Sequence, residues 1–315
     1  MSIQQKLQSF GAPAPETLAF NRGLEETLRG APAPWTVDLD AMRRLRAEGK
    51  SVLPIDGPLP EGRWEPAAGV GSGRVRVIEH PAPKGVYLHI HGGGWTLSAP
   101  EQFDGRNLML SRATEVTVVS AEYRLAPENK WPACADDCEG AALKAIELAG
   151  DLPLLIGGES AGAHLSAVTL LRLRARGLLE RFRGAVLSYG AFDLRATPSV
   201  RNWGDTNLVL STPIIAWFSE NLLEGAGDPS DPAVSPLLAD LDGMPPALFC
   251  VGDQDPLIDD TLFMAERWRA AGAEAELRVW PGGVHAFDYF YAPKYELPIA
   301  LELHEAMADF VRARL

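Results

Sequence analysis

The sequence predicts an α/β fold in which a mostly parallel central sheet is flanked by helices. Short, nearly continuous apolar segments rich in β-branched residues recur along the chain. Stretches with apolar residues three or four positions apart separate most of these segments. Strands without polar alternation are typical of parallel sheets that are covered on both faces, and the intervening helices supply those covers.

The expected strands are bounded by Gly, Pro, Asp or Asn, residues that end strands more often than they continue them. They comprise residues 74–78, 85–90, 116–121, 153–157, 184–189, 247–251 and 276–280. The expected helices comprise residues 108–113, 135–149, 161–175, 256–271 and 298–314, where apolar residues follow the helical period. A chain of 315 residues is long enough for one large domain with an accessory unit.

Two regions interrupt the alternation of strands and helices. Residues 1–70 are rich in Pro and Gly and hold one expected helix at 38–48, and residues 192–243 hold one at 212–223. A structureless loop of that length is unusual in a compact domain, so a small subdomain is expected there. We therefore expect an N-terminal cap segment (1–70) and a cap insertion (192–243). They would cover a main domain made of residues 71–191 and 244–315, at the sheet edge where open α/β folds bind ligands.

The composition is that of a soluble globular protein, with 46% hydrophobic and 23% charged residues. A net charge of −13 repels phosphate backbones and anionic lipids, so neither nucleic acid nor a membrane surface is an expected partner. The N-terminal segment lacks a basic stretch followed by an apolar one, and no long apolar run follows, so neither a signal peptide nor a membrane span is expected. Cys134, Cys138 and Cys250 suit free thiols in a reducing compartment, and the cytoplasm is the expected location.

The strongest local signal is the pentapeptide GESAG at residues 158–162, centred on Ser160. It follows an expected strand and precedes an expected helix, which is the setting of a nucleophile elbow. The glycines lack Cβ atoms that would collide with neighbouring backbone in so tight a turn. Ser160 is therefore a candidate nucleophile at the positive end of a helix dipole. The alternative is a glycine-rich turn with an incidental serine.

A second motif, HGGGW at residues 91–95, follows the expected strand at 85–90. Consecutive glycines leave main-chain N–H groups unshielded, and such donors stabilise the oxyanion that forms in acyl transfer. We assign the donors to the amides of Gly93 and Gly94, joined by that of Ala161. His89 and His91 could share a strand face and a metal, but no further ligand cluster accompanies them, so a bracing role for His91 is preferred.

An acid and a base follow Ser160 in the chain order that this fold requires. Asp253 and Asp255 both lie at the end of an expected strand, and the residues alone leave the choice between them open. His285 follows the last expected strand in a glycine-rich loop, whereas His164 and His304 lie on expected helices. His285 is therefore the expected general base, with a carboxylate fixing its tautomer.

Together, these motifs resemble the hormone-sensitive-lipase-like family of esterases, a bacterial branch of the α/β hydrolases. The resemblance rests on HGGGW at 91–95, YRLAPE at 123–128, WP at 131–132, GESAG at 158–162, SPL at 235–237, DPL at 255–257 and PGGVHAF at 281–287. It implies the α/β-hydrolase fold with a cap, and it favours Asp255 over Asp253 as the acid. Many members of the family carry Asp where this chain has Glu159, from which we expect tuning of the site, not its loss.

The resemblance implies a serine carboxylesterase that hydrolyses short- to medium-chain esters through an acyl-enzyme on Ser160, with no cofactor and no metal. A homodimer through the last strand and helices is also implied. The run GESAGAH is similar to formamide-cleaving relatives as well, so a formamide or aryl-amide substrate is the alternative. A non-catalytic receptor on the same fold is disfavoured because the serine, the acid and the histidine are all present.

Several aromatic residues are candidates for an apolar substrate cleft. Trp95, Tyr189 and Phe192 are predicted to contact the substrate, and Trp203, Trp217 and Phe218 are further candidates. Apolar and aromatic side chains line most small-molecule sites. Aromatic residues in a cap also serve packing, and the sequence leaves that alternative open.

Overall fold

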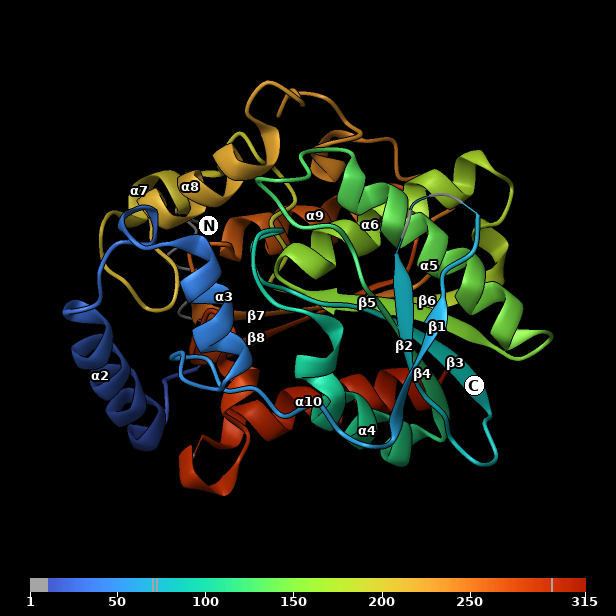
Figure 1. Ribbon diagram of the computed structural model, residues 1–315, viewed down its shortest axis with the longest axis horizontal. Helices are drawn as coiled ribbons and strands as arrows, with labels where there is room; N and C mark the ends of the chain where they lie inside the picture. The colour runs from blue at the N-terminus through green and yellow to red at the C-terminus, as the bar shows by residue number, and fades with distance from the viewer. Residues whose placement is uncertain (1–10, 70, 72, 296) are drawn as a thin grey trace.

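The computed structural model describes residues 11–69, 71, 73–295 and 297–315, so the first ten residues of the predicted cap segment lie outside the described residues. In the described chain, eight strands form one sheet in the order β1-β2-β4-β3-β5-β6-β7-β8 (Figure 1). The strands are β1 (Gly62–Pro66), β2 (Arg74–Ile78), β3 (Gly85–Ile90), β4 (Val116–Ala121), β5 (Leu154–Glu159), β6 (Phe182–Ser188), β7 (Ala247–Gln254) and β8 (Ala275–Val284). The predicted fold class is confirmed.

The sheet is mostly parallel, because strands β3 to β8 all run in one direction. Strand β2 is antiparallel to both of its neighbours, β1 and β4. The edge strand β1 is the one that sequence reasoning missed. In its sequence GRWEP, only Trp64 is a strong strand former, and none of its residues is fully buried. The conformation of β1 therefore depends on its pairing with β2, because its sequence lacks the hydrophobic pattern of a strand.

Helices cover both faces of the sheet. They are α2 (Pro15–Arg29), α3 (Leu39–Ala47), α4 (Asp104–Thr114), α5 (Ala133–Ala149), α6 (Ala161–Ala175), α7 (Pro198–Trp203), α8 (Thr212–Leu223), α9 (Ile258–Ala270) and α10 (Pro298–Arg312). Short 3₁₀ turns lie at Pro34–Thr36, Pro100–Phe103, Leu179–Arg181, Pro236–Leu238, Phe287–Phe290 and Pro293–Tyr295. Helices α2 and α7 were not predicted from the sequence.

Two hydrophobic cores result, one on each face of the sheet. Leu88 and Ile156 point into the core that α5, α6 and α9 cover. Their strand neighbours Tyr87 and Leu155 point into the core on the other face, which α4, α10 and α2 cover. Because both faces of these strands are buried, the continuous apolar runs in the sequence are explained.

The segments predicted to form a cap lie over loops at the carboxyl ends of the parallel strands. From α3, Arg43 donates two hydrogen bonds of 2.9 Å to the carboxylate of Glu128. At the end of α8, the carbonyl of Leu222 accepts from the N–H of Trp131 at 3.0 Å. Helix α7 lies beside α8 (Figure 1). The boundaries proposed for the cap, residues 1–70 and 192–243, stay a prediction.

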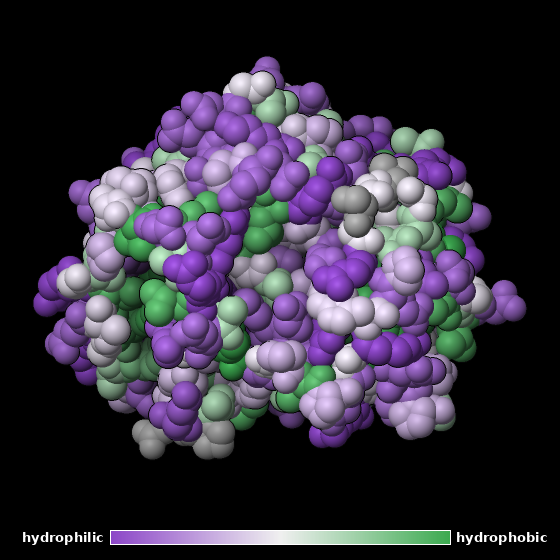
Figure 2. Space-filling model, in the orientation of Figure 1, coloured by the Kyte–Doolittle hydropathy of each residue, from purple (hydrophilic) through white to green (hydrophobic). Residues whose placement is uncertain are grey.

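On the face shown in Figure 2, hydrophilic residues predominate and hydrophobic ones form small patches, in line with a net charge of −13. In the described parts of the chain, every helix is too short or too polar to cross a membrane. Cys134, Cys138 and Cys250 are free and fully buried, as predicted. Burial raises the pKa of the Cys134 thiol to about 12, which keeps it protonated and unreactive.

Candidate active site

Four loops that leave the carboxyl ends of parallel strands meet at one edge of the sheet. The glycine loop follows β3, Ser160 follows β5, Asp255 follows β7 and His285 follows β8. Strands β3 and β5 are neighbours, as are β7 and β8, with β6 between the two pairs. This strand order brings residues that lie nearly 200 positions apart in sequence, from His91 to His285, to one place.

Ser160 occupies a backbone conformation that side chains rarely adopt, with φ of 56° and ψ of −121°. A Cβ atom at Gly158 or Gly162 would collide with the carbonyl oxygen of Ile90, so only glycine fits at either position. The strain at Ser160 is therefore imposed by strand β3 on one side and helix α6 on the other. This is the geometry of a nucleophile elbow, as the pentapeptide predicted.

The Ser160 hydroxyl donates to Nε2 of His285, with an Oγ–Nε2 distance of 3.0 Å. On the other side of the ring, Nδ1 donates to Oδ2 of Asp255 at 2.8 Å. Asp255 is fully buried, and its Oδ1 accepts from the N–H of Leu257 at 2.9 Å. The serine, histidine and aspartate named from the sequence therefore lie in one continuous hydrogen-bonded chain.

The competing residues are engaged elsewhere. Oδ1 of Asp253 accepts from the N–H of Gly282 at 2.7 Å. His164 accepts from the indole of Trp95 and donates to the carbonyl of Val234, at 3.1 and 2.7 Å. Burial lowers the pKa of His164 to about 4 even though the Val234 carbonyl opposes this, so the ring stays neutral. His304 contacts the carbonyl of Asp288 at 3.1 Å.

The glycine loop bends sharply beside Ser160. Gly93 and Gly94 have φ of 118° and 59°, and a Cβ at Gly94 would collide with the ring of Phe218. In the described residues, the amides of Gly93, Gly94 and Ala161 donate to no protein atom, and all three residues border the space next to Ser160. Free main-chain donors at that position suit the binding of an oxyanion.

His91 supports this loop through its ring and its main chain. Nδ1 of His91 donates to the carbonyl of Gly92 at 2.8 Å, and its ring stacks on Tyr123 with centroids 4.2 Å apart. The Tyr123 hydroxyl in turn donates to the carbonyl of His91 at 2.8 Å. Burial lowers the pKa of His91 to about 4 although the Gly92 carbonyl opposes it, which leaves a neutral ring that braces the turn. His91 thus has the role that the sequence suggested.

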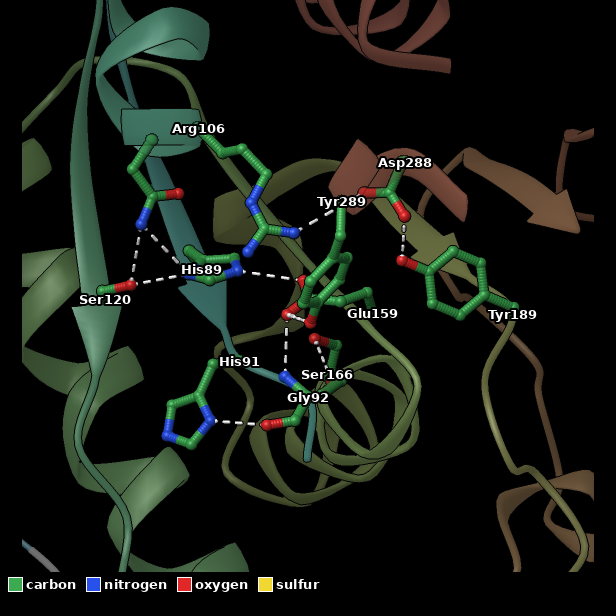
Figure 3. Close-up of polar contacts among 12 residues, drawn as sticks. His89, His91, Gly92, Arg106, Ser120, Glu159, Ser166, Tyr189, Asp288 and Tyr289 are labelled. Carbon is green, nitrogen blue, oxygen red and sulfur yellow. Dashed lines mark hydrogen bonds and ion pairs between the residues drawn. The ribbon is translucent and has the colours of Figure 1, made fainter. Parts of the chain in front are cut away.

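Glu159, next to the nucleophile, ties the elbow to the glycine loop (Figure 3). Its Oε1 accepts from the N–H of Gly92 at 2.7 Å and from the Tyr289 hydroxyl at 3.3 Å. Its Oε2 lies 3.0 Å from Nε2 of His89. Burial raises the pKa of Glu159, but His89, Arg106 and the Gly92 amide together outweigh it, so the pKa lies below its usual 4.5. The carboxylate is therefore charged at neutral pH.

The network continues from Glu159 through His89 to Ser120 (Figure 3). Nδ1 of His89 lies 2.6 Å from Oγ of Ser120, and the Asn107 amide lies within 3.2 Å of both. The Arg106 guanidinium lies 3.7 Å from the ring centroid of Tyr289. Every polar atom of His89 has a partner, which is the condition for a buried polar network to stabilise the fold. Sequence reasoning did not find this network, since its members are scattered between positions 89 and 289.

Two cavities flank Ser160. The larger has a volume of about 210 Å³ and is also lined by His285, Gly93 and Arg46. Its apolar lining includes Met42, Leu97, Val209, Leu210, Ile214 and Phe218. The smaller has a volume of about 30 Å³ and lies on the side of Ala161, between Trp95, Leu257 and Phe218. The site therefore has room on either side of a reacting carbonyl group.

Comparison with known proteins identifies the fold family. A family model described as "alpha/beta hydrolase fold" matches residues 87–289, the stretch that contains the glycine loop, Ser160, Asp255 and His285. The chain belongs to the α/β-hydrolase fold family.

Solved structures of other α/β hydrolases superpose closely on this one. The esterase from the archaeon Pyrobaculum calidifontis gives a TM-score of 0.84 at 26% identity, over 96% of this chain and 99% of that one. A hormone-sensitive lipase from a metagenome library gives a TM-score of 0.83 at 28% identity, over the same shares of the two chains. The resemblance to hormone-sensitive-lipase-like esterases that the motifs indicated is thereby confirmed.

Curated relatives of this α/β hydrolase carry esterase names. "Carboxylic ester hydrolase LipN" from Mycobacterium tuberculosis is 36% identical over 75% of this chain and 63% of its own length. The chain thus spans somewhat under two thirds of that relative. "Arylesterase" from Saccharolobus solfataricus is 32% identical over 64% of this chain and 68% of its own length.

Some of the aromatic residues predicted to contact substrate line a cavity, and others are buried in the core. Trp95 borders the smaller cavity, and Phe218 borders both. Tyr189 and Phe192 are fully buried and line neither cavity. The Tyr189 hydroxyl donates to Asp288, and its ring packs edge-on against His285 with centroids 4.9 Å apart. The positions of Tyr189 and Phe192 thus correspond to packing beneath the site of this α/β hydrolase, not to contact with substrate.

Sequence reasoning also missed contributions from the N-terminal region. Met42, Arg46, Val52 and Leu53 line the larger cavity, yet they precede every motif by about 40 residues or more. Only the expected helix at 38–48 hinted at them, since it was expected to cover the sheet edge. Among the described residues, the structure contains no group of three or more His, Cys, Asp or Glu arranged to hold a metal. His89 and His91 instead make the structural contacts described above.

Proposed function

We propose that this protein is a serine carboxylesterase that hydrolyses short- to medium-chain esters through an acyl-enzyme on Ser160. The observation that carries the proposal is the hydrogen-bonded chain from Ser160 through His285 to Asp255, beside three main-chain amides without protein acceptors. The names of the relatives, among them carboxylic ester hydrolase and carboxylesterase, agree with the predicted activity.

Each group has a defined role in this mechanism. His285 takes the proton of the Ser160 hydroxyl as the oxygen attacks the ester carbonyl, and Asp255 stabilises the imidazolium that forms. The amides of Gly93, Gly94 and Ala161 donate to the carbonyl oxygen as it becomes negative. His285 then gives its proton to the departing alkoxide, which leaves as the alcohol. A water molecule, deprotonated by His285, attacks the acyl-enzyme and releases the carboxylic acid.

The decisive variant is Ser160→Ala, assayed on p-nitrophenyl acetate. We expect kcat to fall by roughly 10⁴-fold or more, with a circular dichroism spectrum and melting temperature close to those of the parent protein. Near-parental turnover in this variant would show that Ser160 is not the nucleophile. An acyl series from acetate to octanoate then defines the chain-length range.

The cytoplasmic location and the homodimer belong to this proposal as well. Three buried free cysteines support a reducing compartment. Light scattering of the purified protein over a range of concentrations tests the dimer, and a constant monomer mass would count against it.

A further inference from the structure

Arg46 is a buried cation in the wall of the substrate cavity. It projects from α3, has an exposed fraction of 6%, and lines the larger cavity together with Ser160 and His285. Its Nε donates to Oγ of Ser98 at 2.6 Å. Throughout the described part of the chain, neither Nη nitrogen of Arg46 has a protein acceptor, and no carboxylate lies within ion-pair distance.

The other buried arginines show how unusual this arrangement is. Of the arginines among the described residues, only Arg46, Arg76 and Arg106 are buried. Arg76 is paired with Asp104 through three hydrogen bonds of 2.5 to 2.8 Å. Arg106 lies 3.2 Å from Asp56. Arg46 alone among them has no carboxylate partner.

The neighbour on the same helix makes the contrast sharper. Arg43, three residues earlier in α3, binds Glu128 and also donates to the carbonyls of Thr96 and Ala126. Arg43 therefore already fixes α3 to the loop below it. Anchoring of the cap helix does not by itself require a second arginine at position 46.

The Arg46 guanidinium has little contact with bulk water and lies in the wall of a cavity that a ligand can enter. Burial lowers the pKa of Arg46, although Glu159 and other groups attract its charge. Glu159 is not its direct partner: the carboxylate contacts His89, the Gly92 amide and the Tyr289 hydroxyl instead. A buried charge without a partner is unfavourable, and an incoming anion would supply that partner. The cavity thus favours a ligand with an apolar body and one negative group.

The position of His285 indicates which part of the ester enters this cavity. The departing alkoxide takes its proton from His285, so its oxygen must lie beside that ring. His285 and Ala286 line the cavity of about 210 Å³, whereas the cavity of about 30 Å³ lies on the Ala161 side. The alcohol therefore occupies the larger space with Arg46, and the smaller one suits an acetyl or propionyl group.

We infer that the preferred substrates are short-chain acyl esters whose alcohol carries a carboxylate, and that Arg46 binds this carboxylate. This inference rests on the proposed ester hydrolysis and names its substrate class. Arg46 acts as a specificity determinant: it contacts the substrate and takes no part in proton transfer.

The test compares matched anionic and neutral esters. The substrates are 3- and 4-acetoxybenzoate, each against the corresponding acetoxybenzamide, with the parent protein and Arg46→Met. We expect kcat/KM for the better anionic ester to fall by about 10- to 100-fold in Arg46→Met, the range for a hydrogen bond to a charged group. The neutral amide-bearing ester should change by less than about threefold, and Arg46→Lys should restore part of the preference.

Arg44→Met is the matched control, because Arg44 lies on the same helix and is exposed. It should leave both kcat/KM values unchanged. An anionic-to-neutral ratio that is the same in the parent protein and in Arg46→Met would overturn the inference. A preference that appears only with the anion on the acyl side, as in mono-p-nitrophenyl succinate, would overturn the assignment of the larger cavity to the alcohol.

A binding measurement separates this inference from the proposed function. In Ser160→Ala, 4-acetoxybenzoate should raise the melting temperature, and 4-acetoxybenzamide should raise it less. The double variant Ser160→Ala/Arg46→Met should lose that difference. If the anion stabilises both variants equally, Arg46 does not bind it, whatever the fate of the esterase assay. If neutral acetates are hydrolysed through Ser160 without any Arg46 effect, only the substrate class is wrong.

Discussion

Two carboxylate–histidine pairs lie near the nucleophile, and they differ in the group that the far nitrogen of the histidine ring contacts. In one, Asp255 binds His285 at 2.8 Å, and the far ring nitrogen accepts from the Ser160 hydroxyl. In the other, Glu159 binds His89 at 3.0 Å, and the far ring nitrogen contacts Ser120. The residue types are nearly the same. The histidine of the first pair lines the cavity that contains Ser160, whereas the second pair borders a separate cavity of about 50 Å³ that does not contain it.

This difference shows that a carboxylate and a histidine are not a catalytic unit by themselves. His285 can exchange a proton with a reacting oxygen because its free nitrogen faces a hydroxyl at the cavity. Both ring nitrogens of His89 are engaged by Glu159 and Ser120, and His89 lines neither cavity beside Ser160. Its pair instead holds the N–H of Gly92, and through it the start of the loop that contains Gly93 and Gly94. The Asp255–His285 pair is expected to transfer protons, and the Glu159–His89 pair is expected to position the main-chain donors of the glycine loop.

Replacing each histidine in turn should produce the largest difference between the two pairs. His285→Asn should lower kcat on p-nitrophenyl acetate by roughly 10⁴-fold or more, because Ser160 loses its base. His89→Asn should lower it only about tenfold, because the donors are displaced but the base remains. Equal losses in the two variants would contradict the division of roles.

Glu159→Gln tests whether the second pair acts through the glycine loop. Glutamine keeps an oxygen for the Gly92 amide but removes the charge that holds His89. We expect kcat to fall by about 10- to 100-fold while KM changes by less than about threefold, the pattern of donors that act only in the transition state. Glu159→Asp, which keeps the charge, should recover part of the loss. A change confined to KM would indicate a role in substrate binding instead.

His89→Asn also tests whether the Glu159–His89 pair stabilises the folded protein. The carboxylate of Glu159 would keep the Gly92 amide but lose its buried histidine partner. An unsatisfied buried acceptor costs about 1–3 kcal/mol, so the melting temperature should fall by several degrees. His285→Asn should change the melting temperature less, because the asparagine amide can replace Nδ1 of His285 as the donor to Asp255. The reverse order in differential scanning calorimetry would show that the Glu159–His89 pair is not the more structural one.

Asp260 extends the comparison to a third buried carboxylate, which accepts from the amides of Phe192 and Asp193 and from the Thr197 hydroxyl. Burial raises its pKa from 3.8 to about 7, although these donors oppose the shift. Between these two pH values, Asp260 keeps its proton in the folded protein but has lost it in the unfolded chain. The resulting stabilisation of the folded state is complete below pH 3.8 and is lost as the pH rises through about 7.

Asp260→Asn removes this titration. The melting temperature of the variant relative to the parent should therefore increase by a few degrees between pH 5 and pH 8. The measurement is a pair of thermal unfolding series across that range. Parallel curves for the two proteins would show that Asp260 does not carry a raised pKa.

The sequence predicted those parts of the fold in which burial alone determines the residue types. Strand β3 and the glycine loop after it, and strand β5 with GESAG, are buried on both sides, so apolar runs and glycines marked them plainly. Strand β1 and helix α2 are partly exposed and polar, and tertiary pairing decides their structure. No local pattern distinguished them from loops.

The residues of the site fall into the same two groups, those with a local sequence signal and those whose position depends on tertiary contacts. Ser160, an acid and His285 follow strands in a fixed order, which made their meeting predictable from the sequence. The choice of Asp255 over Asp253 came from the family resemblance. Arg46 was missed because its burial and lack of a partner depend on how α3 lies over the glycine loop. Tyr189 and Phe192 were assigned to the cleft because an aromatic residue in sequence does not reveal whether it faces a cavity or the core beneath it.

The central claim is that the Ser160 hydroxyl is made nucleophilic by His285. Labelling with a fluorophosphonate, followed by peptide mass spectrometry, tests it most directly, since the reagent reacts covalently with activated serines only. The account predicts one adduct, on Ser160, in the parent protein, much slower labelling in His285→Asn and none in Ser160→Ala. An adduct on another residue, or a parent protein that is not labelled at all, would contradict it.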